Sequence, residues 1–361
     1  MLDWVERGEI DLGEAYDRLR VLERSRGVRR RYARLAILVS VTGWVLFLNG
    51  VDAATVGVAL LASVLTLPTG VVVDRLRLPS VTSTFLSAVI LAAVPNLVAA
   101  AGVSLEVGPA VVGGLFVYLP GRALVSSVID GLSNLPLSAV ARGVQAIVAA
   151  GALAIGMLVG SRIGAGLGLN YRPELNAAPL AVSVLGAVVG MFGLAVVWAM
   201  PRALLLPTLV MGAAGWLVVA LGTSSPGEGT GWAAYALGAA LVGLCGVLFA
   251  TLQAASASIY TGVAILPLVP GFTLYRGVLA LAQGRNAAAT ATFGEAAVIS
   301  LAIAVGVAFG LAFGRNLLAV GERIRGAGDR PIRRARRLPT AADRPPRRRT
   351  GIRPRRRGGS S

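Results

Sequence analysis

The sequence contains no lysine and no histidine, and its 361 residues include a single cysteine, Cys245. Without lysine there is no phosphate-loop lysine and no Schiff-base chemistry. Without histidine, the common zinc sites and the Ser–His and Cys–His nucleophile pairs are also missing. A lone cysteine cannot form an internal disulfide. We therefore expect no enzyme, no metal site and no bound cofactor.

Charge is also scarce, because only 14% of the residues are charged while 55% are hydrophobic. Mean hydropathy is +0.74, and a soluble domain would have an apolar share nearer ~45–50%. The formal net charge of +17 comes from 34 arginines against 17 acids. Many of these arginines lie near the two ends of the chain, so the long middle is apolar and indicates a membrane protein.

Ten stretches are long enough to cross a bilayer as helices, which takes about 20 mostly apolar residues. The sequence therefore predicts an all-α polytopic membrane protein. The predicted spans are 35–51, 53–73, 80–103, 107–129, 137–161, 177–200, 203–221, 232–252, 256–280 and 287–314.

The arginines predict the orientation, since positively charged short loops stay in the cytoplasm. With ten spans, Arg34, Arg75, Arg202 and the Arg-rich tail all fall on one side. We therefore expect a bacterial inner-membrane protein with both termini in the cytoplasm. Its predicted parts are a juxtamembrane helix, two membrane repeats and a disordered tail that attracts anionic lipid rather than nucleic acid: 1–34, 35–165, 176–314 and 315–361.

An internal repeat relates residues 120–164 to 270–314 at a constant offset of 150. Thirteen of these 45 positions are identical, among them Pro120-Gly121 with Pro270-Gly271 and a ladder of three glycines in each copy. Each half then holds five spans, and an odd number places the halves in opposite orientations, as in many secondary transporters. The glycine ladders either pack the fifth span against the tenth or pack each against a different neighbour.

The predicted ninth span contains Pro267, Pro270 and Gly271, which favour a break in the helix. A break leaves carbonyl groups and amide groups that need partners inside the bilayer. A zwitterion can supply both, with its ammonium group at the carbonyl ends and its carboxylate at the amide ends. The alternative is a simple proline kink that neighbouring helices satisfy.

Few polar side chains lie within the predicted spans. Glu295 is about eight residues into the tenth span, and a carboxylate at such depth marks an ion or proton path by default. Gln145 occupies the equivalent position in the first half. Asp130 and Arg142 flank the turn between spans four and five, where they could pair as a cytoplasmic gate or be solvated loop residues.

Three segments resemble the bacterial threonine/serine exporter family: Gly8–Ala15, Asp130–Arg142 and Pro267–Gly277. The resemblance implies ten spans in two halves and export of small hydroxy amino acids driven by the proton gradient. Family members usually carry a longer soluble segment before a stretch like Gly8–Ala15. Similar proteins with separate halves are associated with dicarboxylate export.

On this resemblance we predict a proton-coupled threonine/serine exporter, with homo-oligomerisation left open. Glu295 and Asp130 would couple protons, and Arg142 and Gln145 would form a gate. The alternatives are a dicarboxylate exporter and a non-transporting membrane scaffold. The predicted substrate-binding residues are Pro120, Gly121, Pro267, Pro270, Gly271, Thr273, Tyr275 and Arg276.

Overall fold

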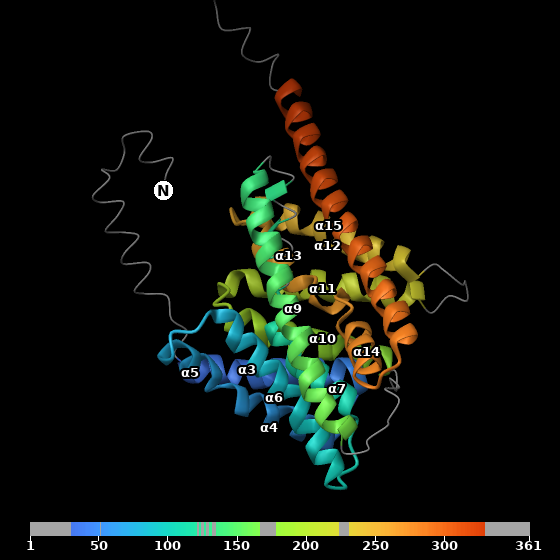
Figure 1. Ribbon diagram of the computed structural model, residues 1–361. Helices are drawn as coiled ribbons and strands as arrows, with labels where there is room; N and C mark the ends of the chain where they lie inside the picture. The colour runs from blue at the N-terminus through green and yellow to red at the C-terminus, as the bar shows by residue number, and fades with distance from the viewer. Residues whose placement is uncertain are drawn as a thin grey trace, which may run out of the picture. The chain divides into compact units, whose positions relative to one another are not determined.

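The computed structural model describes residues 30–50, 52–120, 123, 126–127, 130–131, 135–166, 178–223 and 231–328. Every regular element in these ranges is a helix (Figure 1). Most of the predicted juxtamembrane helix, Gly121 and the end of the Arg-rich tail lie outside the described residues. Residues up to Arg315 form one compact unit, and Asn316–Ser361 form a second.

The described part of the first half contains six complete helices and one 3-10 turn before residue 167. Asp52 caps α4, because its carboxylate accepts hydrogen bonds from the backbone N–H groups of Ala54 and Thr55. Pro68 separates α4 from α5, since proline has no N–H to donate to the preceding turn. The elements are α3 (Arg30–Asn49), α4 (Ala53–Thr66), α5 (Thr69–Arg75), α6 (Ser80–Ala100), α7 (Val107–Leu115), η1 (Phe116–Tyr118) and α9 (Pro136–Gly166).

The second half follows a similar order, and several elements begin 150 residues after a counterpart in the first half. Thus α3 begins at Arg30 and α10 at Leu180, while η1 begins at Phe116 and η2 at Leu266. The elements are α10 (Leu180–Val197), α11 (Arg202–Thr223), α12 (Gly231–Leu252), α13 (Ala257–Ala264), η2 (Leu266–Leu268), α14 (Gly271–Ala282) and α15 (Asn286–Gly328).

The last helix is longer than the predicted tenth span. α15 continues to Gly328, whereas the sequence predicted a span ending at 314 and a disordered tail from 315. No proline interrupts the chain until Pro331, so the backbone hydrogen bonds of the helix continue beyond its apolar part.

Eight helices in the described ranges are long and apolar enough to cross a membrane, and a bent pair formed by α13–η2 and α14 makes a ninth candidate. The chain is therefore a multi-pass membrane protein. The predicted fourth span differs, because α7 and η1 end at Tyr118 and most of residues 121–134 lie outside the described ranges. The predicted count of ten therefore stays a prediction.

Helices α3 and α10 pack with their backbones in contact. A Cβ atom added to Gly43 would collide with the backbone of Gly190, so neither side of this contact has room for a side chain. Such approaches in membrane helices need small residues at the crossing. Residues with higher numbers on α10 contact residues with lower numbers on α3, so the two helices run antiparallel.

The contact between α3 and α10 is reciprocal. A Cβ on Gly193 would lie 2.5 Å from the carbonyl oxygen of Ala36, and one on Gly186 would lie 2.8 Å from that of Gly43. Adding 150 to 36 and 43 gives 186 and 193, so the second pair is the first with its members exchanged. At the centre, the Ser40 hydroxyl donates a hydrogen bond of 2.9 Å to the carbonyl oxygen of Gly190, 150 residues away.

The two glycine ladders pack against different neighbours. Gly156 and Gly160 of α9 lie against α6, where added Cβ atoms would meet Ala88 and Ala92 at 2.7 and 2.6 Å. Gly306 and Gly310 of α15 lie against α12. The sequence left two arrangements open, and the structure has the one in which each glycine ladder packs against a different neighbour, a helix of its own half.

Replacing Gly43 by alanine should destabilise the protein, because the new methyl group meets backbone atoms that cannot rotate away. Overpacking of this kind costs roughly 1–3 kcal/mol. Gly57→Ala in α4 is the matched control, because its Cβ meets nothing within 4 Å and alanine favours the helix. The thermal unfolding temperature in detergent should fall for Gly43→Ala and not for Gly57→Ala. Equal unfolding temperatures for the two variants would contradict the close contact.

Candidate substrate cavity at the broken helices

The break predicted near Pro270 is present. η2 ends at Leu268, Val269 is extended, and α14 begins at Gly271. The axes on the two sides of the break differ by 52°. Neither Pro267 nor Pro270 has an N–H group to continue the helical hydrogen bonds, and the Gly271 N–H turns back to the Val269 carbonyl at 2.7 Å.

The first half has a similar interruption. η1 ends at Tyr118, and Leu119 takes φ −62° and ψ 132°, close to the −63° and 129° of Val269. The backbone N–H of Leu119 donates to Phe116, as that of Val269 donates to Leu266. Pro120 follows and is half-buried. The two Pro-Gly motifs therefore come after the same local conformation.

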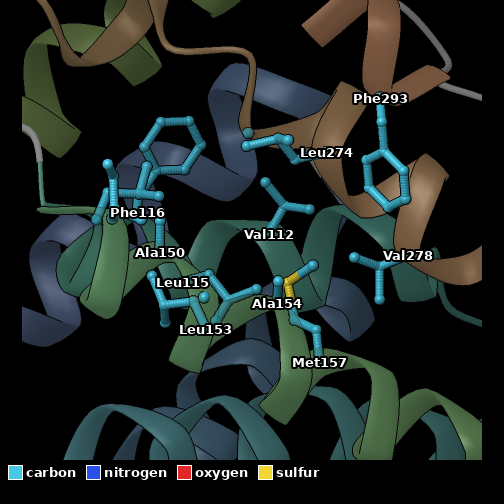
Figure 2. Close-up of a pocket in the computed structure, with 14 residues that line it drawn as sticks. Val112, Leu115, Phe116, Ala150, Leu153, Ala154, Met157, Leu274, Val278 and Phe293 are labelled. Atoms are coloured by element: carbon cyan, nitrogen blue, oxygen red, sulfur yellow. The ribbon is translucent and has the colours of Figure 1, made fainter. Parts of the chain in front are cut away.

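A cavity of about 390 Å³ lies beside the break in the second half. Figure 2 shows side chains of α7, η1 and α9 facing others from α14 and α15 across it. All of the lining side chains that the structure describes are apolar. They belong to Val112, Leu115, Phe116, Leu119, Ile147, Ala150, Gly151, Leu153, Ala154, Met157, Gly271, Leu274, Val278 and Phe293.

Of the predicted substrate-binding residues, Gly271 lines this cavity. Pro267 and Pro270 are buried, Thr273 is half-buried, and Arg276 is exposed. Tyr275 is fully buried, with its ring 6.0 Å from that of Phe272. The break therefore forms as the sequence indicated, but apart from Gly271 the residues at the cavity wall are apolar neighbours that the sequence did not single out.

Glu295 and Gln145 are both exposed on the surfaces of their helices. The sequence placed Glu295 at membrane depth, and the structure places it two residues after Phe293, which lines the cavity while Glu295 does not. Glu295 lies near the Tyr235 side chain of α12. Depth along a helix was readable from the sequence, whereas the direction of the side chain depends on packing.

Asp130 and Arg142 form the ion pair that the sequence offered as one of two alternatives. The Arg142 Nε atom lies 2.9 Å from Asp130 Oδ2, with side-chain exposures of 50% and 17%. The Ser138 hydroxyl also donates to Asp130 Oδ2, at 2.5 Å. The pair joins the end of the partly described segment 123–131 to the start of α9.

An aromatic cluster at the α3–α10 contact was not predicted. The Trp44 ring is fully buried and stacks on Phe116 with centroids 4.1 Å apart. Its Nε1–H donates to the Ser40 hydroxyl at 3.1 Å. Trp44 therefore links the helix contact to a residue of the cavity wall. The sequence signal for it was the row of glycines in 186–193, which leaves space for a large ring.

A hydroxyl cluster around Pro68 was also missed. The Thr66 hydroxyl donates to the Ser63 carbonyl and the Thr69 hydroxyl to the Thr66 carbonyl, both at 2.7 Å. These hydroxyls satisfy carbonyls near the proline interruption, which is required in an apolar environment. The Tyr118 hydroxyl donates to Thr66 Oγ1 at 2.7 Å, so the cluster also holds η1 in place.

The fold and the cavity define a multi-pass membrane protein with interrupted helices around a small-molecule-sized hollow. The ThrE family model of threonine/serine exporters matches residues 1–164, and the ThrE_2 model, described as "Threonine/Serine exporter, ThrE", matches residues 183–313. The chain belongs to the threonine/serine exporter family.

A curated relative from Mycobacterium tuberculosis (strain ATCC 25618 / H37Rv), named "Probable threonine/serine exporter", is 28% identical over 240 residues. The match covers 62% of this chain and 44% of the relative, so the chain spans less than half of that protein. No solved structure matches the chain. The family resemblance read from the motifs is thereby confirmed.

The Tyr118–Thr66 hydrogen bond should contribute measurably to stability. Tyr118→Phe and Thr66→Val each remove one partner, and the double variant should be less destabilised than the sum of the two. We expect a coupling of about 0.6 kcal/mol, the average for hydrogen bonds between membrane helices. Thr223→Val, which removes a hydroxyl bonded within its own helix, is the control; additive effects would contradict the role given to this bond.

Proposed function

We propose that the protein exports threonine and serine across the bacterial inner membrane, with both termini in the cytoplasm. Family membership gives the class of transporter. The observation that carries the proposal is the cavity beside the break at Gly271, bounded on its other side by Phe116 and Leu119 before the equivalent interruption. The first backbone N–H groups of α14 would receive the substrate carboxylate, as amide groups at helix N-termini receive anions.

We also propose that the two halves form an inverted repeat of five spans each. The exchange of pairs between α3 and α10 supports this arrangement, because a two-fold axis produces such self-complementary contacts. Equivalent helices that run antiparallel require an axis perpendicular to their length. Such an axis lies in the membrane plane, as in transporters with inverted-topology repeats.

The dicarboxylate alternative receives no support from the cavity wall. A dianion in an apolar hollow needs cationic partners, and no arginine is among the described lining residues. Arg142 is engaged by Asp130, and Arg276 is exposed. A zwitterion with a small side chain fits these surroundings better, because it brings no net charge.

Cells fed threonine- or serine-containing peptides test the function directly. With the gene present, intracellular threonine and serine should fall faster than without it; identical levels would refute the proposal.

Enlarging Phe116 tests whether the cavity is the transport site. Phe116→Trp should lower threonine efflux several-fold, because the larger ring occupies space that the substrate needs. Phe309→Trp is the matched control, since Phe309 is 64% exposed on α15. Efflux from loaded proteoliposomes measures both variants at equal protein amounts. Equal loss of efflux in the two variants would remove the cavity from the transport path.

For proton coupling we propose Glu295 and Asp130, with Arg142 and Gln145 at a gate. Glu295→Gln should abolish efflux driven by a pH gradient while leaving threonine–threonine exchange, because exchange needs no net proton movement. Asp74→Asn, an exposed acid on α5, should leave both activities intact. Gradient-driven efflux that persists unchanged in Glu295→Gln would exclude this carboxylate as the proton carrier.

A further inference from the structure

The end of the cavity away from the break is closed by a phenylalanine of α15. Gly271, Leu274 and Val278 of α14 line the hollow, and their spacing of three and four residues places them on one face of the helix. Phe293 also lines the hollow, and its ring packs beside Gly277, which precedes Val278. Figure 2 shows Phe293 and Val278 on the same side of the hollow. The hollow therefore runs along α14 from its first residue to this ring.

The distance from the break to the ring is short. Gly277 is six residues after Gly271, and six residues of α-helix rise about 9 Å. A substrate whose carboxylate meets the first N–H groups of α14 has only the space up to Phe293 for its side chain. The cavity volume of about 390 Å³ is also near the lower end of ligand sites, roughly 300–1,000 Å³. The ring therefore stands where a longer side chain would have to extend.

The Phe293 ring lies directly against the backbone of α14. A Cβ atom added to Gly277 would lie 2.6 Å from one carbon of the ring and 2.8 Å from another. No side chain fits between the ring and the helix, so the glycine determines how closely the ring approaches. Gly277 is not among the described residues that line the cavity. Any effect of Gly277 on the hollow therefore passes through Phe293.

The first half has no ring at the equivalent place. The positions 150 residues before Gly277 and Phe293 are Ser127 and Gly143. These two residues also face each other, since a Cβ added to Gly143 would lie 3.2 Å from the Ser127 hydroxyl oxygen. The same contact therefore forms with small residues on both sides. Because this contact does not require an aromatic ring, the ring in the second half points to a further role.

We propose, resting on the amino-acid export proposed above, that Phe293 is the specificity-determining residue of this cavity. Its ring limits the length of the substrate side chain, so that serine and threonine enter while leucine and phenylalanine are excluded. The exclusion is steric, and one methylene group in a pocket changes discrimination by roughly 10–200-fold. All four amino acids carry the same zwitterion, so a comparison among them isolates the side chain.

Phe293→Ala removes the ring and should open the hollow to leucine. Leucine should then compete with labelled threonine about tenfold better than in the parent protein. Phe309→Ala is the matched control on the same helix, because Phe309 is 64% exposed and is not among the described lining residues. Threonine–threonine exchange in proteoliposomes is the assay, because it needs no net proton movement and so does not depend on the proton coupling proposed for Glu295.

Two further variants keep the test independent of lost packing. Phe293→Leu retains an apolar side chain and should admit leucine to an intermediate extent. Phe293→Trp enlarges the ring and should lower threonine exchange several-fold more than serine exchange, because threonine has the additional methyl group. A purely structural role for the ring would reduce both exchanges equally, and thermal unfolding in detergent shows which variants are folded.

Gly277→Ala tests whether the glycine is a positioning residue that acts through the ring. The added methyl group displaces the ring, so the ratio of serine to threonine exchange should change several-fold. In the Phe293→Ala protein the same substitution should leave this ratio unchanged, because no ring remains to be displaced. A change of equal size in both backgrounds would overturn the role given to Gly277.

The outcomes separate the two proposals. If the parent protein exchanges threonine and serine, and leucine stays excluded from folded Phe293→Ala and Phe293→Leu, export stands and the inference is wrong. The inference is also wrong if the parent protein exchanges leucine as readily as threonine, or if Phe309→Ala admits leucine as well as Phe293→Ala does. If the parent protein transports no amino acid, both proposals fail.

Discussion

The backbone contact between α3 and α10 is the constraint on which the arrangement depends. Gly43 and Gly190 leave no room for side chains between the helices, and helices this close gain dispersion and weak polar contacts that lipid cannot replace. The Ser40 hydrogen bond to Gly190 fixes the register at a separation of 150 residues. The Trp44 ring, which belongs to α3, stacks on Phe116 of the cavity wall. The position of this part of the wall therefore depends on how closely the two helices pack.

Each half is closed by its own glycine ladder, α9 on α6 and α15 on α12. The halves meet along the antiparallel pair α3–α10, which has one of the most extensive helix contacts in the described part of the chain, and also where α14 packs on α9 and α7. The cavity is lined by α7, η1 and α9 of one half and by α14 and α15 of the other. The cavity therefore lies at a second contact between the halves, beside the one formed by α3 and α10.

Several features were readable from the sequence because they depend on the backbone. The break at Pro270 follows from missing N–H groups, and the constant offset of 150 carries over to the starts of α3 and α10. Side-chain direction was not readable. In a membrane protein apolar residues face both lipid and interior, so Leu153 in the core and Ile155 on the surface look alike in sequence, although their exposures are 5% and 58%. Glu295 illustrates the same limit for a polar residue.

The two halves differ in where their helices are interrupted and in which side chains form hydrogen bonds near the interruptions. In the first half, hydroxyls of Thr66, Thr69 and Tyr118 take up polar groups near Pro68 and η1. The equivalent positions, 150 residues on, are Trp216, Val219 and Leu268, which bring no hydroxyl. The counterpart of the Pro68 interruption lies inside α11, which is one helix from Arg202 to Thr223, so the second half needs no hydroxyls there. Its own interruption is at Val269–Gly271, and under the proposed function a zwitterion bound at Gly271 would supply a partner for the backbone N–H groups at the start of α14.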